Sequence, residues 1–321
     1  MIRRRFIAAS VCAILSAAAG AQSRASRVAL VTLGSLDKHP VASFGEGMRE
    51  LGYQDGRNVQ ILPPWPNARH AQLADMAAEA VKRESDVIVT YGATATEAAR
   101  RATRSIPIVM VIGADPVALG IVSNLARPEG NVTGVSTSTQ VLIQKRVELL
   151  KEVLPGMRRL AALWNSSSAG QTGSLELLRR ASQQLGVAVQ PIDLKDRKGL
   201  SGVAELLRGE RPDALTALPS TTLVALGHQI VRLADDLRIP AVYTDAEFVR
   251  AGGLISYSAD AKAQLRRAAY YVDRILKGAR PGELAVEQPT KFELAVNLRT
   301  AKTLKLTIPA GVMIRADEVV E

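Results

Sequence analysis

The sequence of 321 residues has few of the side chains that most enzymes use for covalent or metal chemistry. It contains one cysteine, Cys12, and three histidines, His39, His70 and His228. No two of these histidines have the spacing of a metal site, and none stands in a familiar Ser, His and Asp motif. The sequence therefore predicts no catalytic residue, no metal site and no cysteine nucleophile. We expect a protein that is not an enzyme.

Signs of cofactor or nucleic-acid binding are also missing. The segment GADPVALG, residues 113–120, lacks the GxGxxG pattern of a dinucleotide site, so no cofactor is predicted. The net charge is +10, or +7 without Arg3, Arg4 and Arg5 (10 − 3 = 7). The remaining Lys and Arg residues are spread along the chain with acidic residues between them, and only 4% of the residues are aromatic. This distribution is typical of solvated helix faces and predicts no nucleic-acid partner.

The chain has one strongly apolar run, and it lies near the N-terminus. Arg3, Arg4 and Arg5 precede apolar residues 6–19, and Ala19-Gly20-Ala21 form a small-x-small cleavage site. About 14 apolar residues are fewer than the roughly 20 that a membrane-spanning helix needs. We interpret residues 1–21 as a signal peptide that is cleaved near Ala21, which implies export to the periplasm. An ordinary and a twin-arginine export signal both remain possible. Cys12 would be removed with the signal peptide, which leaves a mature chain without disulfides.

The rest of the chain alternates short β-branched runs with amphipathic helices. Residues 106–138 show the pattern most clearly: a strand over 107–112, a turn with Asp115, an amphipathic helix to Leu125, and a strand ending at Ser136. A new helix then begins near Thr139. Strands that alternate with helices of 10 to 15 residues indicate α/β architecture with parallel sheets and right-handed crossovers.

The length and the repeated pattern predict two Rossmann-like lobes. We expect lobe 1 to comprise residues 27–137 and about 258–288, and lobe 2 to comprise residues 138–257 and about 289–321. The chain would then cross between the lobes three times, and such a hinge permits closure around a ligand. Parallel sheets bind ligands at the carboxyl ends of their strands, so we expect a cleft there.

Several segments resemble one known family. They are FGEGMRELGYQDGRNV (44–59), ADPVALGIVSNLARPEGNVTGVS (114–136), KRVELLKEVLP (145–155), EFVRAGGLISY (247–257) and VEQPTKFELAVNLRTAKTLKLTIP (286–309), followed by RADEVVE (315–321). Together they resemble the exported substrate-binding proteins of ABC transporters, in the group that includes the tryptophan-uptake type. Three positions depart from the family pattern. Glu129 replaces a Gly, Ser166 replaces a Pro, and Gly92-Ala93-Thr94 replaces Gly-Thr-Pro. The last two touch the expected pocket.

The resemblance implies a type I periplasmic-binding-protein fold. It also implies a protein that captures an amino acid or a related small metabolite and delivers it to an ABC permease in the inner membrane. We expect this protein to be a monomer. A receptor subunit that signals to a membrane sensor without transport remains the alternative. A DNA-binding regulator with the same bilobed fold would carry a helix-turn-helix at the position of the signal peptide.

Candidate ligand-binding residues of lobe 1 lie where strands end. Thr94 and Thr96, with Gly92, can hold an anion or simply cap the helix that follows. Asp115 can accept a hydrogen bond from a ligand amine or cap a helix that begins at Val117. Ser136 can likewise contact a ligand or cap a helix. The other two candidates are Ser35, in the turn after the first strand, and Trp65, which would form an apolar wall of the site or pack between loops.

Hydroxyl-rich strand ends supply the candidates of lobe 2. Asn165 in the turn 165–168, and Ser220 and Thr221 in the turn after the next strand, would close over the same ligand, although Ser and Thr are common in such loops anyway. Tyr243 and Glu247 lie at the ends of later strands. Glu247 can pair with a ligand amine or with a nearby Arg.

Overall fold

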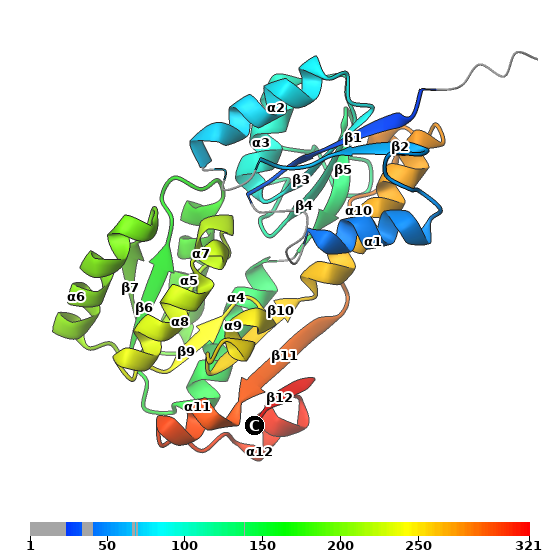
Figure 1. Cartoon of the computed structure of the whole chain (residues 1–321). Coiled ribbons are helices and arrows are strands. Elements are labelled where there is room, and N and C mark those ends of the chain that lie inside the picture. Colours follow the sequence, from blue (N-terminus) through cyan, green and yellow to red (C-terminus); the bar gives the residue numbers. More distant parts are fainter. Residues whose placement is uncertain (1–23, 34–40, 66–67, 69, 138) are drawn as a thin grey trace, which may run out of the picture.

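The computed structural model describes residues 24–33, 41–65, 68, 70–137 and 139–321. The predicted signal peptide and Ser35 lie outside the described residues. Two α/β lobes lie side by side, each built on its own sheet (Figure 1). Within the described part, no helix has the length and hydropathy needed to cross a membrane.

Lobe 1 contains a five-stranded parallel sheet in the order β2-β1-β3-β4-β5. Its strands are β1 (Ser26–Val31), β2 (Val59–Leu62), β3 (Val87–Tyr91), β4 (Ile108–Ile112) and β5 (Val132–Ser136). Its helices are α1 (Ala42–Glu50), the 3-10 turn η1 (His70–Gln72), α2 (Leu73–Lys82), α3 (Ala93–Ala102) and α10 (Ala261–Leu276).

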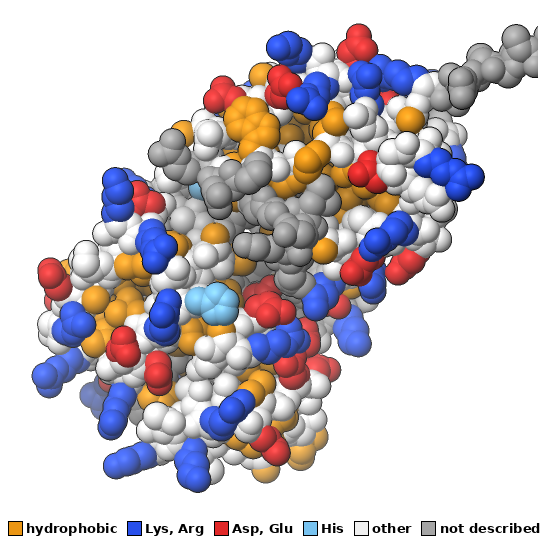
Figure 2. Space-filling model, in the orientation of Figure 1, with side chains coloured by type: hydrophobic (Ala, Val, Ile, Leu, Met, Phe, Trp, Pro, Cys, Tyr) orange, Lys and Arg blue, Asp and Glu red, His pale blue; other side chains and the backbone are white. Residues whose placement is uncertain are grey.

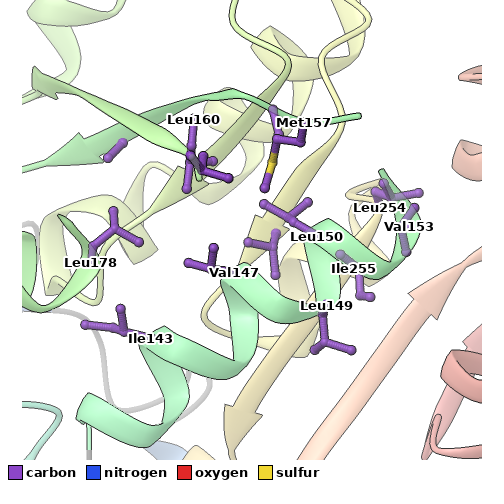
Figure 3. Close-up of a cluster of buried hydrophobic side chains, with 14 of the residues drawn as sticks. Ile143, Val147, Leu149, Leu150, Val153, Met157, Leu160, Leu178, Leu254 and Ile255 are labelled. Atoms are coloured by element: carbon purple, nitrogen blue, oxygen red, sulfur yellow. The ribbon is translucent and has the colours of Figure 1, made fainter. Parts of the chain in front are cut away.

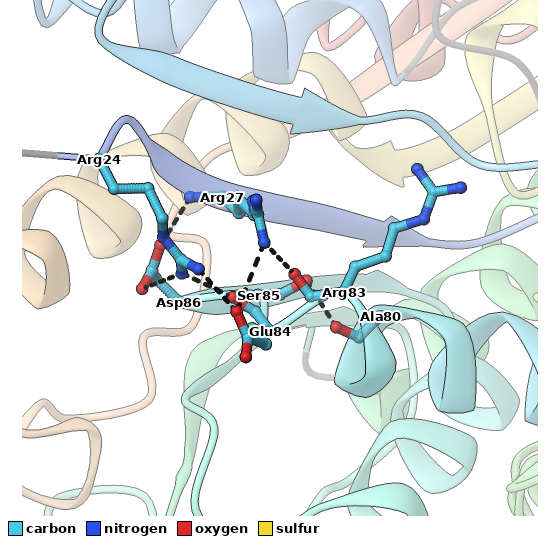
Figure 4. A network of polar contacts seen from close by, with 7 residues as sticks. All are labelled: Arg24, Arg27, Ala80, Arg83, Glu84, Ser85 and Asp86. Carbon is cyan, nitrogen blue, oxygen red and sulfur yellow. Dashed lines mark hydrogen bonds and ion pairs between the residues drawn. The ribbon is translucent and has the colours of Figure 1, made fainter.

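Alternate side chains of the strands of lobe 1 supply two hydrophobic cores. Val28 and Leu30 point to the face covered by α1 and α10, whereas Ala29 and Val31 point to the face covered by α2 and α3. This period of two is what places helices on both faces of a parallel sheet. At the start of β1, the backbone N–H of Arg27 donates to Asp86 at 2.6 Å, which fixes the register of the first strand (Figure 4).

Lobe 2 contains a seven-stranded sheet in the order β12-β11-β10-β9-β8-β6-β7. Its strands are β6 (Arg159–Trp164), β7 (Ala188–Asp193), β8 (Ala214–Ala217), β9 (Ala241–Tyr243), β10 (Ile255–Ala259), β11 (Phe292–Asn297) and β12 (Glu318–Val320). Its helices are α4 (Thr139–Val153), α5 (Gln171–Gln184), α6 (Leu200–Glu210), α7 (Thr221–Ala225), α8 (Gly227–Asp236), α9 (Ala246–Arg250), α11 (Leu298–Thr303) and α12 (Ala310–Ile314). The 3-10 turns are η2 (Arg197–Gly199) in lobe 2 and η3 (Pro281–Glu283), which precedes β11.

Helix α4 provides much of the main core of lobe 2. Ile143, Val147 and Leu150 recur at helical spacing and pack with Leu160 of β6 and Leu178 of α5 (Figure 3). Strand β11 runs antiparallel to β10, whereas the other pairings of this sheet are parallel. The reversal arises because the chain enters β11 after returning from lobe 1.

The chain passes between the sheets at three places: after β5, between β10 and α10, and between η3 and β11. The last passage is tied to lobe 1. Arg267 makes a bidentate ion pair with Glu287 at 2.7 and 2.6 Å, and the backbone of Glu287 bonds to Gly134 and Ser136 of β5. The segment that can pivot is therefore the short stretch from residue 288 to the start of β11.

One predicted element is wrong. No helix spans residues 117–125, where the chain forms turns instead. Gly120 has φ +62, and the N–H groups of Ile121 and Val122 fold back to the carbonyl of Pro116. A left-handed residue at this position ends any helix, while Ile121 and Val122 still reach the core. The elements α12 and β12 were not predicted from the sequence.

Candidate functional site

A cavity of about 120 Å³ lies between the lobes, where the carboxyl ends of strands from both sheets meet. Lobe 1 lines it with residues 91–94, at the end of β3, and residues 111–114, at the end of β4. Lobe 2 lines it with residues 168–171 after β6, residues 219–221 after β8, and residues 244 and 245 after β9. This is the position at which open parallel sheets bind ligands.

Four of the residues singled out from the sequence line this cavity: Gly92, Thr94, Ser220 and Thr221. Thr94 reaches the other lobe, because its hydroxyl accepts a hydrogen bond of 3.1 Å from the backbone N–H of Ala169. Gly92 has φ +98, and a side chain there would lie 2.8 Å from the methyl carbon of Thr221. The two lobes therefore touch beside the cavity, and the structure represents a closed arrangement.

Thr96 and Ser136 do not line the cavity. The Thr96 hydroxyl is fully buried, lies 2.7 Å from the hydroxyl of Thr90 and donates to the carbonyl of Gly92. The Ser136 hydroxyl donates to the carbonyl of Ala114 at 3.0 Å. Both hydroxyls donate to backbone carbonyls of lobe 1, so neither acts as the N-cap of a helix, the other role considered for them.

Asn165 and Asp115 also bond to their own loops. The side-chain carbonyl of Asn165 accepts from the N–H and the hydroxyl of Ser167 at 3.0 and 2.6 Å. A carboxylate oxygen of exposed Asp115 accepts from the N–H groups of Val117 and Ala118 at 2.9 and 3.2 Å. Asp115 thus stabilises the turn that replaces the predicted helix, and neither residue lines the cavity.

The remaining described candidates lie away from the cavity. Tyr243 is buried in the core of lobe 2, where its ring stacks on Phe248 with centroids 4.9 Å apart. Glu247 pairs with Arg250 at 2.7 Å on the surface, which is the structural alternative expected for it. Trp65 is exposed and lies outside the residues that line the cavity.

The most informative residue of the cavity, Arg146 of α4, was not among the residues predicted from the sequence. Its side chain is 4% exposed, and its Nε donates to the carbonyl of Tyr257 at 2.7 Å. Burial lowers the pKa of Arg146 to about 9, against the opposing effect of Tyr257 and Asp245, so the guanidinium is still a cation at neutral pH. Within the described residues, no hydrogen bond or ion pair joins its terminal amino groups to another side chain. A buried cation in this state favours an anionic partner.

Arg146 could have been found from the helical pattern. Ile143, Val147 and Leu150 define the buried face of α4, and Arg146 lies on that face between them. A charged residue among core positions is uncommon unless it has a partner. Polar residues 137, 171, 174 and 264 also line the cavity, and each is buried. Gln264 accepts a hydrogen bond of 3.0 Å from the hydroxyl of Thr137 at the hinge end.

Gly170 gives a direct test of lobe closure. A side chain at Gly170 would lie 2.9 Å from the Cβ of Ala114 in the other lobe. Gly170→Ala is expected to weaken ligand binding about tenfold by obstructing closure, and titration calorimetry would measure this. Gly186→Ala is the matched control, because Gly186 has a similar φ (+68 against +79) but no atom within 4 Å of the added carbon. Equal affinity losses in both variants would contradict the prediction.

The described residues contain no cluster of three or more His, Cys, Asp or Glu side chains that could hold a metal ion. One relative of similar sequence is named as a binding protein. The chain is 27% identical over 295 residues to a tyrosine-binding protein of Clostridioides difficile (strain R20291), covering 90% of this chain and 84% of that protein.

Two solved structures have the same fold. A conserved domain protein of Vibrio cholerae has a TM-score of 0.85 and 25% identity, covering 92% of this chain and 100% of that one. An ABC domain from Streptococcus pneumonia in complex with L-Trp has a TM-score of 0.84 and 24% identity, covering 92% and 99%. The predicted α/β fold of two lobes is therefore confirmed. The family model for ABC transporter substrate binding proteins matches residues 28–320, and the chain belongs to this family of substrate-binding proteins.

Proposed function

We propose that this protein captures an amino acid or a closely related small metabolite in the interlobe cavity and presents the closed form to an ABC permease. The observation that carries the proposal is the buried guanidinium of Arg146, which faces the cavity without a carboxylate bonded to its amino groups. A ligand carboxylate would supply the missing partner with charge-assisted hydrogen bonds.

The rest of the lining supports the same ligand class. Asp245 also lines the cavity, so a negative group stands near the positive one, and one of its carboxylate oxygens accepts from the N–H of Glu247 at 2.9 Å. Beside them lie apolar side chains that can contact an uncharged part of the solute: Tyr91, Val111, Ile112, Leu142, Pro219 and Val224. The tyrosine-binding relative also takes an amino acid, which supports the choice.

The predicted signal peptide supports a location in the periplasm, where such a protein would meet its solute before the permease. The mechanism requires no chemistry. The solute binds both lobes, so it favours the closed arrangement over the open one by its extra contacts. The closed contacts at Thr94 and Gly92 are consistent with this role.

The test is to purify the protein from its native compartment, denature it and identify the released small molecules by mass spectrometry. Amino acids are then titrated against the ligand-free protein by calorimetry. We expect one amino acid or small carboxylate to be enriched. At 100 times its dissociation constant it should stabilise the protein by about 2.7 kcal/mol. The ligand class is wrong if no such compound is released and none raises the melting temperature. Loss of uptake of the identified solute in a strain without the protein would support delivery to a permease.

A further inference from the structure

His70 joins the two lobes beside the cavity. It belongs to η1 of lobe 1, and its Nε2 lies 2.5 Å from the hydroxyl of Thr222 and 3.5 Å from that of Thr221, both in α7 of lobe 2. The chain crossings lie elsewhere: α10 and β11 run along one side of the molecule, whereas α7 approaches the start of α2 on the other (Figure 1). The contact at His70 can therefore form only while the lobes are closed.

The other ring nitrogen of His70, Nδ1, has no partner among the described residues. Nδ1 is buried and makes no hydrogen bond within the part of the chain that the structure describes. The neutral ring leaves one nitrogen unsatisfied, whichever tautomer it adopts. A protonated ring would bury both a positive charge and an N–H without an acceptor, which costs more free energy. The closed arrangement therefore disfavours protonation of His70.

Nearby charged groups do not make protonation of His70 favourable in the closed arrangement. Helix α7 has the sequence TTLVA and no ionisable side chain, while α2 carries Asp75, Glu79 and Lys82. Burial is the only cause of the lowered pKa of His70, so none of these charges offsets it. Arg69 precedes His70 in the sequence and lies outside the described residues, and an arginine keeps its charge between pH 5 and 8.

We propose that His70 is a pH-sensitive latch, which holds the lobes closed while its ring is neutral and releases them when the ring is protonated. The latch concerns the lobes themselves and goes beyond the proposed function. Only its consequence for solute affinity rests on that function: affinity would fall on acidification, because binding is coupled to closure.

The direction of the pH effect on lobe closure follows from proton linkage. In the open form His70 is no longer covered by α7 and titrates near the ordinary value of about 6.5, whereas burial lowers its pKa in the closed form. Well above pH 6.5 the ring is neutral in both forms, so pH has no effect on closure there. As the pH falls below 6.5 the open form takes up the proton first, so the ratio of closed to open molecules falls by up to about tenfold between pH 7.5 and 5.5.

The test measures lobe closure directly and needs no known ligand. Cys12 is the one cysteine of the sequence and lies in the predicted signal peptide, so the mature chain has no competing thiol. Ala74→Cys in α2 and Ala225→Cys in α7 then place spin labels at exposed positions on opposite lobes. Double electron–electron resonance then gives the distance distribution at pH 7.5 and 5.5, without solute and with L-tyrosine. We expect a short-distance population at pH 7.5 that shrinks at pH 5.5. His70→Gln, which retains a hydrogen-bonding side chain that does not titrate, should remove the change. His228→Gln, an exposed histidine of α8, should not.

Each other outcome overturns the latch. A short-distance population that does not change with pH, or that changes equally in His70→Gln, shows that His70 does not control closure. The absence of a short-distance population under every condition shows that the lobes do not meet. The proposed function fails separately: a protein that closes in a pH-dependent way but binds no amino acid keeps the latch and loses the ligand class.

Discussion

Arg146→Met is expected to reduce solute affinity by about 30-fold to 1,000-fold, which corresponds to the 2–4 kcal/mol typical of removing one partner from a buried charged pair. The guanidinium is 4% exposed and faces the cavity, so the substitution removes a buried positive charge from the ligand site. Calorimetric titration with the solute identified from the native protein would measure the loss.

The same substitution should not destabilise the ligand-free protein. Arg146 is desolvated, and within the described part of the chain its side chain makes one hydrogen bond, from Nε to the carbonyl of Tyr257. An apolar side chain of similar length avoids the cost of a buried charge, so the melting temperature is expected to stay the same or rise. A fall in both affinity and melting temperature would indicate that Arg146 serves the fold and would remove the basis of its ligand role.

Lys145→Met is the matched control, because it removes the same charge from the neighbouring residue. Lys145 pairs with Glu148 at 3.1 Å on the surface, and such pairs contribute about 0–1 kcal/mol. Its affinity should match that of the unchanged protein. If Lys145→Met weakened binding as much as Arg146→Met, the effect would come from the overall positive charge of lobe 2. Figure 2 shows basic and acidic side chains interspersed over the visible face, which argues against such a long-range field.

The sequence predicted the fold better than the site, and the reason is physical. Strand and helix periodicity repeats over many residues, so the order of elements and the three crossings could be inferred. The departures depend on single residues, such as Gly120, whose left-handed backbone ends the expected helix, and on the short strand β12, which has three residues. A single glycine or a run of three residues is too short to show the periodicity from which a helix or strand is predicted.

Site residues were harder to predict because strand ends carry many hydroxyl groups with two possible roles. Thr94 and Thr96 lie two residues apart on α3, yet Thr94 reaches Ala169 across the cavity and Thr96 bonds inward to Thr90. The sequence does not specify which of them faces the other lobe, since this depends on how the lobes meet. Arg146, in contrast, was detectable as a charge on an apolar helix face.

Gly134→Ala is expected to destabilise lobe 1 by more than about 3 kcal/mol, the largest stability effect that we predict. Gly134 lies in β5 next to Met110 of β4, and its φ is +135, a conformation that side chains rarely adopt. An added Cβ would lie 2.1 Å from the carbonyl oxygen of Met110, which is backbone inside a sheet and cannot move aside. The carbonyl of Gly134 also accepts from Glu287, so the strain would reach the third crossing.

Urea unfolding would measure this change, and Gly173→Ala supplies a control of opposite sign. Gly173 lies inside α5 with no atom within 4 Å of the added carbon, so alanine should stabilise the helix by about 0.5–1 kcal/mol. A Gly134→Ala protein as stable as the original would mean that β4 and β5 can separate at this point. In that case the close approach of the two backbones would not be the reason that position 134 requires glycine.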